Sequence, residues 1–161
     1  MNNKYYISSS DWDLEFLSLA KRISKRSKDP STKVGAVITN KKRFVSSGYN
    51  GLPQKMKDTK NRLDNRELKY KIIIHGEINA ILFAQRDLTD HTLYTWPFMP
   101  CSNCASIIIQ TGIKRVVSFI NNNERWKDNF LLTEESFQES GVELVLYTEE
   151  DLKQYESNRY V

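Results

Sequence analysis

Four residues in this 161-residue chain have the types and the spacing of a catalytic zinc site. His75 lies two residues before Glu77, and Cys101 and Cys104 lie three residues apart; the chain has only two cysteines and two histidines. One imidazole and two thiolates suit Zn²⁺, and three protein ligands leave a fourth position for water or substrate. A closed structural site would need one more ligand, and His91 is the remaining histidine.

The residues around the two cysteines favour thiolates at the start of a helix. Pro100 is typical of a helix start, and Cys101 and Cys104 at i and i+3 point to the same side of that helix. The unpaired N–H groups of a helix start favour thiolate over thiol. Glu77 is expected to stay off the metal and to carry protons. The alternative is a structural CxxC pair or two buried thiols.

The order of these residues matches a known signature. His75-x-Glu77 is followed after 22 residues by Pro100-Cys101-x-x-Cys104, and H-x-E…P-C-x-x-C is the pattern of the zinc nucleobase deaminases. A lone CxxC would be a weak signal. The order and spacing of both halves make the pattern more specific.

Length and composition predict one globular domain, residues 1–161, with an ordinary core. The chain is 39% hydrophobic and 11% aromatic, and no run reaches the roughly 18 apolar residues of a membrane span. The first residues lack the apolar centre of a signal peptide. Cysteines used as ligands imply a reducing compartment, so we expect a cytoplasmic protein without membrane contact.

Charge is unevenly distributed along the chain. Residues 1–71 contain 17 Lys/Arg against 7 Asp/Glu, and residues 72–161 contain 7 against 13. The basic half could serve nucleotide phosphates or nucleic acid, or it could simply be a solvated surface. The chain has no low-complexity basic arm, which favours a small phosphorylated substrate and makes nucleic acid an unlikely partner.

Hydrophobic periodicity and turn signals predict alternating helices and strands. Strands are expected at 34–38, 44–49, 92–96, 115–119 and 142–147, and helices at 11–26, 76–85, 101–111, 133–140 and 149–155. We expect helix 133–140 to begin at Thr133 and helix 76–85, apolar on most faces, to be central. The polar segment 55–71 is expected to be a long loop with a short helical turn near 66–70.

This order predicts an α/β protein, a three-layer α-β-α sandwich around a five-stranded mixed sheet. The first two strands are expected to form an antiparallel hairpin, and the later ones to run parallel through crossover helices. Both halves of the metal motif precede helices at the ends of strands or loops. Ligand sites of open α/β sheets occur at such positions.

The chain resembles the deoxycytidylate deaminase family over roughly residues 12–120. The matching segments are residues 26–36 (RSKDPSTKVGA), 48–53 (GYNGLP), 75–81 (HGEINAI), 100–105 (PCSNCA) and 109–113 (IQTGI). The resemblance implies a cytidine deaminase-like fold and hydrolytic conversion of dCMP to dUMP for thymidylate synthesis. Family members usually have alanine where this chain has Gly76. The rival interpretation is a deaminase that edits tRNA or single-stranded DNA.

The expected reaction replaces the exocyclic amine of cytosine by oxygen. Zinc lowers the pKa of a bound water enough to supply hydroxide near neutral pH. Glu77 is expected to take the proton from this water, to deliver it to N3, and to help protonate the leaving ammonia.

Seven residues are candidates for contacts with the nucleotide. Asn50 resembles the sugar-contacting asparagine of the family, although an asparagine before Gly51 is also a common turn signal. Backbone groups of Ala36 could meet the base. Phe98 or Trp96 could stack on the base, or either could belong to the core. The candidates for the 5′-phosphate are Arg26, Ser27 and Lys28, which could equally be solvated.

The segment Gly48-Tyr49-Asn50-Gly51 raises the question of regulation. Members of the family often bind dCTP as activator and dTTP as inhibitor near this segment, in hexamers and with Mg²⁺ on the nucleotide. The resemblance therefore implies an effector site and a homo-oligomer. The alternative is that these four residues form only a tight turn.

Overall fold

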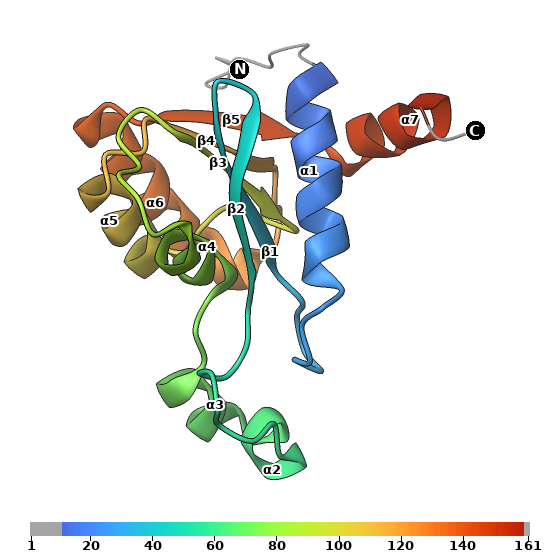
Figure 1. Ribbon diagram of the computed structural model, residues 1–161, viewed down its shortest axis with the longest axis vertical. Helices are drawn as coiled ribbons and strands as arrows, with labels where there is room; N and C mark the ends of the chain where they lie inside the picture. Colours follow the sequence, from blue (N-terminus) through green and yellow to red (C-terminus); the bar gives the residue numbers. More distant parts are fainter. Residues whose placement is uncertain (1–10, 160–161) are drawn as a thin grey trace.

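The computed structural model describes residues 11–159, in which helices and strands alternate (Figure 1). The helices are α1 (Asp11–Ser24), α2 (Lys60–Asp64), α3 (Arg66–Ile72), α4 (Gly76–Ala84), α5 (Ser102–Gln110), α6 (Lys127–Ser140) and α7 (Glu149–Arg159), with a 3-10 turn, η1, at Glu124–Trp126. The strands are β1 (Gly35–Asn40), β2 (Arg43–Tyr49), β3 (Thr92–Trp96), β4 (Arg115–Phe119) and β5 (Glu143–Tyr147). The five predicted strands are therefore confirmed.

The strands form one mixed sheet in the order β2-β1-β3-β4-β5. Strand β1 pairs antiparallel with both β2 and β3, and the pairs β3–β4 and β4–β5 are parallel. Lys41 and Lys42 form the turn between β1 and β2 with positive φ angles of 48° and 62°, as a tight two-residue hairpin turn requires. The parallel pairs need crossover connections, which contain α5 and α6.

Helices cover both faces of the sheet and give three layers (Figure 1). On one face, α1 contributes Phe16 and Ala20 to a buried cluster with residues of β1, β3, β4 and β5. On the other face, Ala80 of α4, Ile108 of α5 and Phe137 of α6 share a second cluster with the sheet. The predicted α-β-α sandwich is confirmed.

Gly48 allows α4 to lie directly against β2. A Cβ atom at Gly48 would come within 2.3 Å of the backbone nitrogen of Ala80 and 2.4 Å of the carbonyl oxygen of Gly76. Such a contact leaves room only for glycine. The Ser46 hydroxyl donates a 2.8 Å hydrogen bond to the carbonyl of Ala80. These contacts fix the start of α4, and therefore His75 and Glu77, against the sheet.

Helix α6 begins at Lys127, so the predicted start at Thr133 is wrong. Thr133 lies inside the helix, is fully buried, and donates a hydrogen bond of 2.9 Å to the carbonyl oxygen of Pro100. Its hydroxyl therefore supports a neighbouring loop and does not cap its own helix.

The expectation that α4 is central is also wrong. Only Gly76, Glu77 and Ala80 of this helix are buried, whereas the side chains of Leu82 and Phe83 are 58% and 52% exposed. The sheet covers one face of α4 and leaves an apolar face open to solvent.

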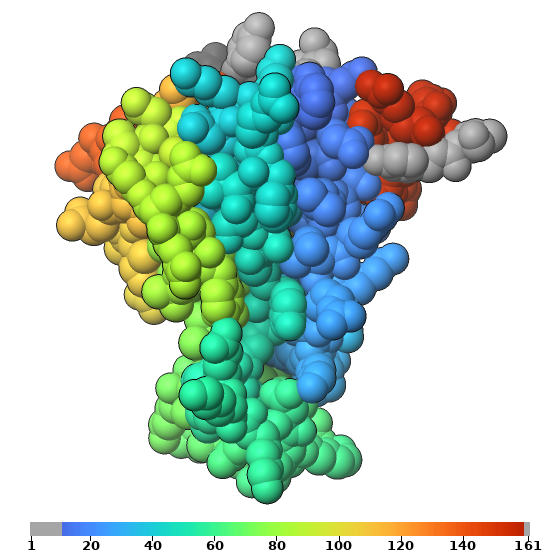
Figure 2. Space-filling model, in the orientation of Figure 1, coloured from blue at the N-terminus to red at the C-terminus, as the bar shows by residue number. Residues whose placement is uncertain are grey.

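The segment 55–71 contains more helix than predicted. Thr59 caps α2 and Asn65 caps α3, each by accepting a hydrogen bond from a backbone N–H group in the first turn. These caps explain why a polar segment without clear periodicity becomes helical. Residues 55–72, the helical lobe, project from one end of the molecule (Figure 1 and Figure 2).

Within residues 11–159, no helix is both long enough and apolar enough to cross a membrane. The prediction that the chain lacks a signal peptide depends largely on residues 1–10, which lie outside the described residues.

Candidate active site

The three predicted metal ligands come from the starts of two helices. His75 is the N-cap residue of α4, Cys101 is the N-cap residue of α5, and Cys104 lies in the first turn of α5. Neither His75 nor Cys101 makes a side-chain capping bond, although capping is the usual role of that position. Both side chains are therefore free for another partner.

The three side chains converge on one point. Their ligand atoms all lie within 4.8 Å of one another. Nδ1 of His75 is 3.6 Å from Sγ of Cys101 and 3.2 Å from Sγ of Cys104. Zinc bonds of about 2.3 Å to sulfur and 2.0 Å to nitrogen place tetrahedral ligands roughly 3.5 Å apart. The donor set and its spacing therefore fit Zn²⁺.

Electrostatics distinguish the two thiols. A hydrogen bond from Cys104 lowers the pKa of Cys101 to about 4; burial opposes this effect, and His75 assists it. Donating that bond, together with burial, raises the pKa of Cys104. The hydrogen bond to Cys101 also raises the pKa of His75. One thiolate is thus preformed, and binding of a metal would release the proton of the other.

Glu77 lies beside this group, outside the set of three. Its side chain is 3% exposed, and its Oε2 is 4.0 Å from Sγ of Cys104. Burial raises the pKa of the carboxyl, although a backbone hydrogen bond and His75 partly offset this effect. A carboxyl whose pKa is raised toward neutrality can both accept and donate a proton.

Two residues of α6 hold the cysteine turn, a role that the sequence did not predict. Asn129 accepts a hydrogen bond of 3.0 Å from the backbone N–H of Ser102, and its amide donates to the Ser102 hydroxyl at 3.1 Å. Thr133 donates to Pro100. Asn129 and Thr133 are four residues apart, so they share one helix face. That spacing could have been noticed only after α6 had been extended to Lys127.

Asn50 is buried, and its side chain is occupied within the protein. Its Oδ1 accepts a hydrogen bond of 2.8 Å from the Val34 N–H, and its Nδ2 donates at 2.8 Å to the Thr32 carbonyl. The Ser27 hydroxyl, also buried, donates to the Asn50 carbonyl at 2.8 Å. Asn50 and Ser27 therefore shape the segment of residues 27–34, which we call the 27–34 loop.

The other two phosphate candidates point to different places. Lys28 is exposed, and its ammonium group forms an ion pair of 2.7 Å with Asp58 of the helical lobe. Arg26 lines a cavity on the outer side of β2. The fold does not gather Arg26, Ser27 and Lys28 into one anion-binding cluster.

Of the candidates for contact with the base, Trp96 packs on the α1 face of the sheet. It lies edge-on to Phe119 at 5.1 Å between ring centroids, whereas α4 and α5 cover the opposite face. Phe98 is half-buried and lies 5.8 Å from Phe130, in the segment that leads to Cys101. Ala36 is fully buried between its strand partners Gly48 and Thr95. Phe98 is thus the better placed of the two aromatic candidates.

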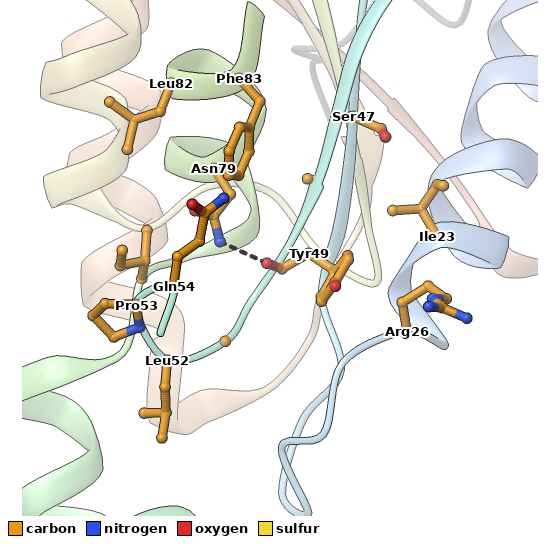
Figure 3. Close-up of a pocket in the computed structure, with 13 residues that line it drawn as sticks. Ile23, Arg26, Ser47, Tyr49, Leu52, Pro53, Gln54, Asn79, Leu82 and Phe83 are labelled. Atoms are coloured by element: carbon orange, nitrogen blue, oxygen red, sulfur yellow. Dashed lines mark hydrogen bonds between the residues drawn. The ribbon is translucent and has the colours of Figure 1, made fainter. Parts of the chain in front are cut away.

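The predicted effector segment borders a cavity with a volume of about 670 Å³. Figure 3 shows this cavity beside β2, with Arg26 and Ile23 of the α1 region on one side and Asn79, Leu82 and Phe83 of α4 on the other. Gly48, Tyr49 and Gly51 contribute to its wall, and Asn79 donates a 2.8 Å hydrogen bond to the Tyr49 carbonyl.

The end of β2 is also tied to the metal-binding group. Gly51 and Ile74 exchange two backbone hydrogen bonds, of 3.1 and 2.8 Å, directly before His75. One short segment, residues 48–51, therefore contacts the 27–34 loop, the cavity and the chain that leads to His75.

Comparison with known proteins gives a family match over more than half of the chain. Residues 10–120 match the cytidine and deoxycytidylate deaminase zinc-binding region. An uncharacterized deaminase of Aliivibrio fischeri, from the luxG 3′ region, is 43% identical over 138 residues, which are 84% of this chain and 92% of the relative. The deoxycytidylate deaminase of Homo sapiens is 34% identical over 142 residues, 82% of this chain and 77% of the relative.

Among solved structures, the dCMP deaminase of cyanophage S-TIM5, in complex with dCMP and dUMP, has the same fold. Its TM-score is 0.69 at 20% sequence identity, and the alignment covers 87% of this chain and 99% of that chain.

Proposed function

This chain belongs to the cytidine and deoxycytidylate deaminase family, and we propose that it is a zinc-dependent deoxycytidylate deaminase, which converts dCMP to dUMP for thymidylate synthesis. The observation that carries the proposal is the convergence of His75, Cys101 and Cys104 beside the buried carboxyl of Glu77. These side chains form a soft three-ligand metal site with an adjacent proton carrier.

Each residue has a separate task in this reaction. His75, Cys101 and Cys104 would hold Zn²⁺, which would supply Lewis-acid activation of water near neutral pH. Glu77 stays off the metal and moves protons between the water, N3 of cytosine and the leaving amine. Burial of Glu77 supports this task, because the raised pKa of its carboxyl makes protonation easier.

The nucleotide is proposed to lie between the 27–34 loop and the starts of α4 and α5. Asn50 bonds that loop at Val34, and the next residue, Gly51, pairs with Ile74 directly before His75, which supports this placement. Phe98 is our candidate for stacking on the base. Neither Cys101 nor Cys104 forms a disulfide, which fits a reducing compartment such as the cytoplasm.

The cavity beside β2 is proposed as the effector site for dCTP or dTTP with Mg²⁺. Arg26 offers a cation to a triphosphate, and Tyr49 and Gly51 border the same space. We also propose a homo-oligomer, with the hexamer of the family as the expected form. The exposed apolar side chains of Leu82 and Phe83 support an association surface on α4.

One assay tests the function directly. Ammonia release is measured from dCMP, deoxycytidine, dCTP and a cytosine-containing oligonucleotide, side by side. We expect kcat/KM for dCMP to exceed that for deoxycytidine by at least roughly tenfold, because binding energy from the phosphate can be used in the transition state. Preference for the oligonucleotide would support a nucleic-acid-editing deaminase. No release from any of the four would contradict deaminase activity on cytosine nucleotides.

A further inference from the structure

Lys69 of α3 is an unusual residue because its charged group is buried. The side chain is 4% exposed, and Nζ lies 2.9 Å from Oδ1 of Asp29, whose side chain is 7% exposed. Nζ also donates to the Ser31 hydroxyl at 3.3 Å. Lysine is almost never fully buried without such partners, because desolvation of its charge must be offset. The pair links α3 to the 27–34 loop across 40 positions of sequence.

Asp29, which lies in the 27–34 loop, also accepts hydrogen bonds from another residue of that loop and from Asn50. Its Oδ1 accepts a hydrogen bond of 2.8 Å from the backbone N–H of Ser31, and its Oδ2 accepts from Nδ2 of Asn50 at 3.4 Å. Asn50 in turn holds Val34 and Thr32. A continuous polar chain therefore runs from Lys69 through Asp29 to the amide of Asn50.

A second ion pair between the helical lobe and the loop is much more exposed. Lys28 and Asp58 lie 2.7 Å apart with side chains that are 69% and 33% exposed. Exposed pairs contribute little to stability. Among residues 11–159, these are the two ion pairs that join residues 27–34 to residues 55–72. Lys69 thus provides the buried electrostatic link between the two segments.

We propose that Lys69 is a positioning residue for nucleotide binding: through Asp29 and Asn50 it holds the 27–34 loop in the arrangement that the substrate meets. The inference rests on the proposed deaminase function. The Lys69 ammonium group contacts Asp29 and Ser31 of the 27–34 loop, so its effect should be on substrate binding and not on the metal. A residue that only stabilises the fold would change the free energy of unfolding without changing the affinity of the folded enzyme for dCMP.

The test uses the full-length zinc-loaded protein and three variants. Lys69→Met removes the charge from the pair, and Asp29→Asn breaks the same contact from the other side with little change of shape. Lys71→Met is the matched control, because Lys71 lies two residues away on α3 in an exposed i,i+4 pair with Glu67. For each protein, zinc content, the thermal midpoint of unfolding, and kcat and KM for dCMP are measured, with kcat expressed per zinc-loaded chain.

We expect Lys69→Met and Asp29→Asn to raise KM for dCMP by roughly tenfold or more, since small misplacements of binding groups have large effects. Zinc content should stay unchanged, and kcat should fall much less than KM rises. Lys71→Met should behave as wild type. Amide hydrogen exchange in residues 28–36 should become faster in the first two variants only. In these variants the side-chain oxygens of Asp29 and Asn50 are no longer held in place to accept from the backbone amides of this segment.

Three results would overturn the inference. One is an unchanged KM in Lys69→Met and Asp29→Asn with only a lower melting temperature, which is expected of a residue that only stabilises the fold. Another is a raised KM in Lys69→Met alone, because it would mean direct contact with the ligand. The third is unchanged amide hydrogen exchange of the 27–34 loop in Lys69→Met, which would contradict the positioning role by itself. Absence of ammonia release from dCMP by the wild-type protein would instead contradict the proposed function.

Discussion

Sγ of Cys104 lies 3.2 Å from Nδ1 of His75, although 29 positions separate the two residues. The contact exists because α4 and α5 begin side by side on the same face of the sheet, so residues at their first turns meet. The imidazole faces both thiols through Nδ1. This nitrogen is therefore the one that we assign to the metal.

The first prediction concerns metal content. Purified protein should contain about one zinc per chain, and Cys104→Ser should retain less than roughly a tenth of it, since an alcohol is a poor zinc ligand. Elemental analysis measures this. His91→Gln is the control and should keep its zinc, because Nδ1 of His91 hydrogen-bonds the Thr89 carbonyl and lies outside the converging group. Full zinc in Cys104→Ser would contradict the ligand assignment.

The second prediction separates proton transfer from binding. Glu77→Gln keeps the size of the side chain but cannot carry a proton, so turnover of dCMP should fall by about 10²–10⁴-fold. Zinc content and the dissociation constant for dCMP should stay within a few-fold of wild type. Steady-state kinetics and a binding titration measure the two quantities. A variant that keeps more than a few per cent of the rate would show that another group moves the proton.

The third prediction concerns the metal-free protein. The pKa of Cys101 is lowered to about 4, so this thiol should be a thiolate throughout the neutral range. Its alkylation by iodoacetamide should therefore be nearly independent of pH between about pH 6 and pH 8, where an ordinary thiol reacts faster as pH rises. Cys104 should react slowly, because its pKa is raised. Mass spectrometry locates the label, and added zinc should protect both thiols. An alkylation rate at Cys101 that rises tenfold per pH unit would disagree with the preformed thiolate.

The fourth prediction concerns the buried carboxylate that joins α1 to the sheet. Asp13 accepts two hydrogen bonds of 2.7 Å from Arg115 and further bonds from the hydroxyls of Tyr94 and Tyr147. Asp13→Asn leaves the guanidinium without its main partner, so the free energy of unfolding should fall by about 3–5 kcal/mol. Urea unfolding measures this change.

Asp11→Asn provides the matched control for that experiment. Asp11 is on the same helix, in an exposed pair with Arg159 at 3.2 Å, and its replacement should change stability by less than about 1 kcal/mol. Equal losses in the two variants would mean that burial of Asp13 has no energetic consequence.

The fifth prediction tests regulation and the role of Arg26. In wild type, dCTP with Mg²⁺ should lower the dCMP concentration at half-maximal rate and dTTP should raise it, with a coupling of about 1–3 kcal/mol. Arg26→Gln should abolish both responses, because Arg26 lines the cavity beside β2. Arg22→Gln is the control, since Arg22 is exposed on α1 and does not line that cavity. Sedimentation in parallel reports the assembly.

The same variant distinguishes the two roles considered for Arg26. If Arg26→Gln raises the half-maximal dCMP concentration without any effector, Arg26 serves the substrate phosphate. Superimposable saturation curves of wild type with and without the triphosphates would mean that residues 48–51 carry no switch.

The chemistry of the site could be predicted from sequence because it depends on residue types at short spacing. His75 and Glu77 are two positions apart, and Cys101 and Cys104 are three apart, so local geometry alone keeps each pair together. The five strands were predictable for a similar reason, since their apolar runs and turn signals are local. The fold then needed only the rule that alternating strands and helices form layers.

What surrounds the site was decided by tertiary packing. Apolar periodicity along α4 could not tell that Leu82 and Phe83 remain exposed, because burial depends on which element covers a face. The sequence of β3 likewise does not show that Trp96 lies on the α1 face of the sheet. Asn50 has the sequence of a turn residue, yet its amide is occupied by partners 16 to 21 positions away. Lys69 sits in a polar, basic segment, and only the approach of Asp29 makes its burial possible, because a buried charge is stable only beside its partner.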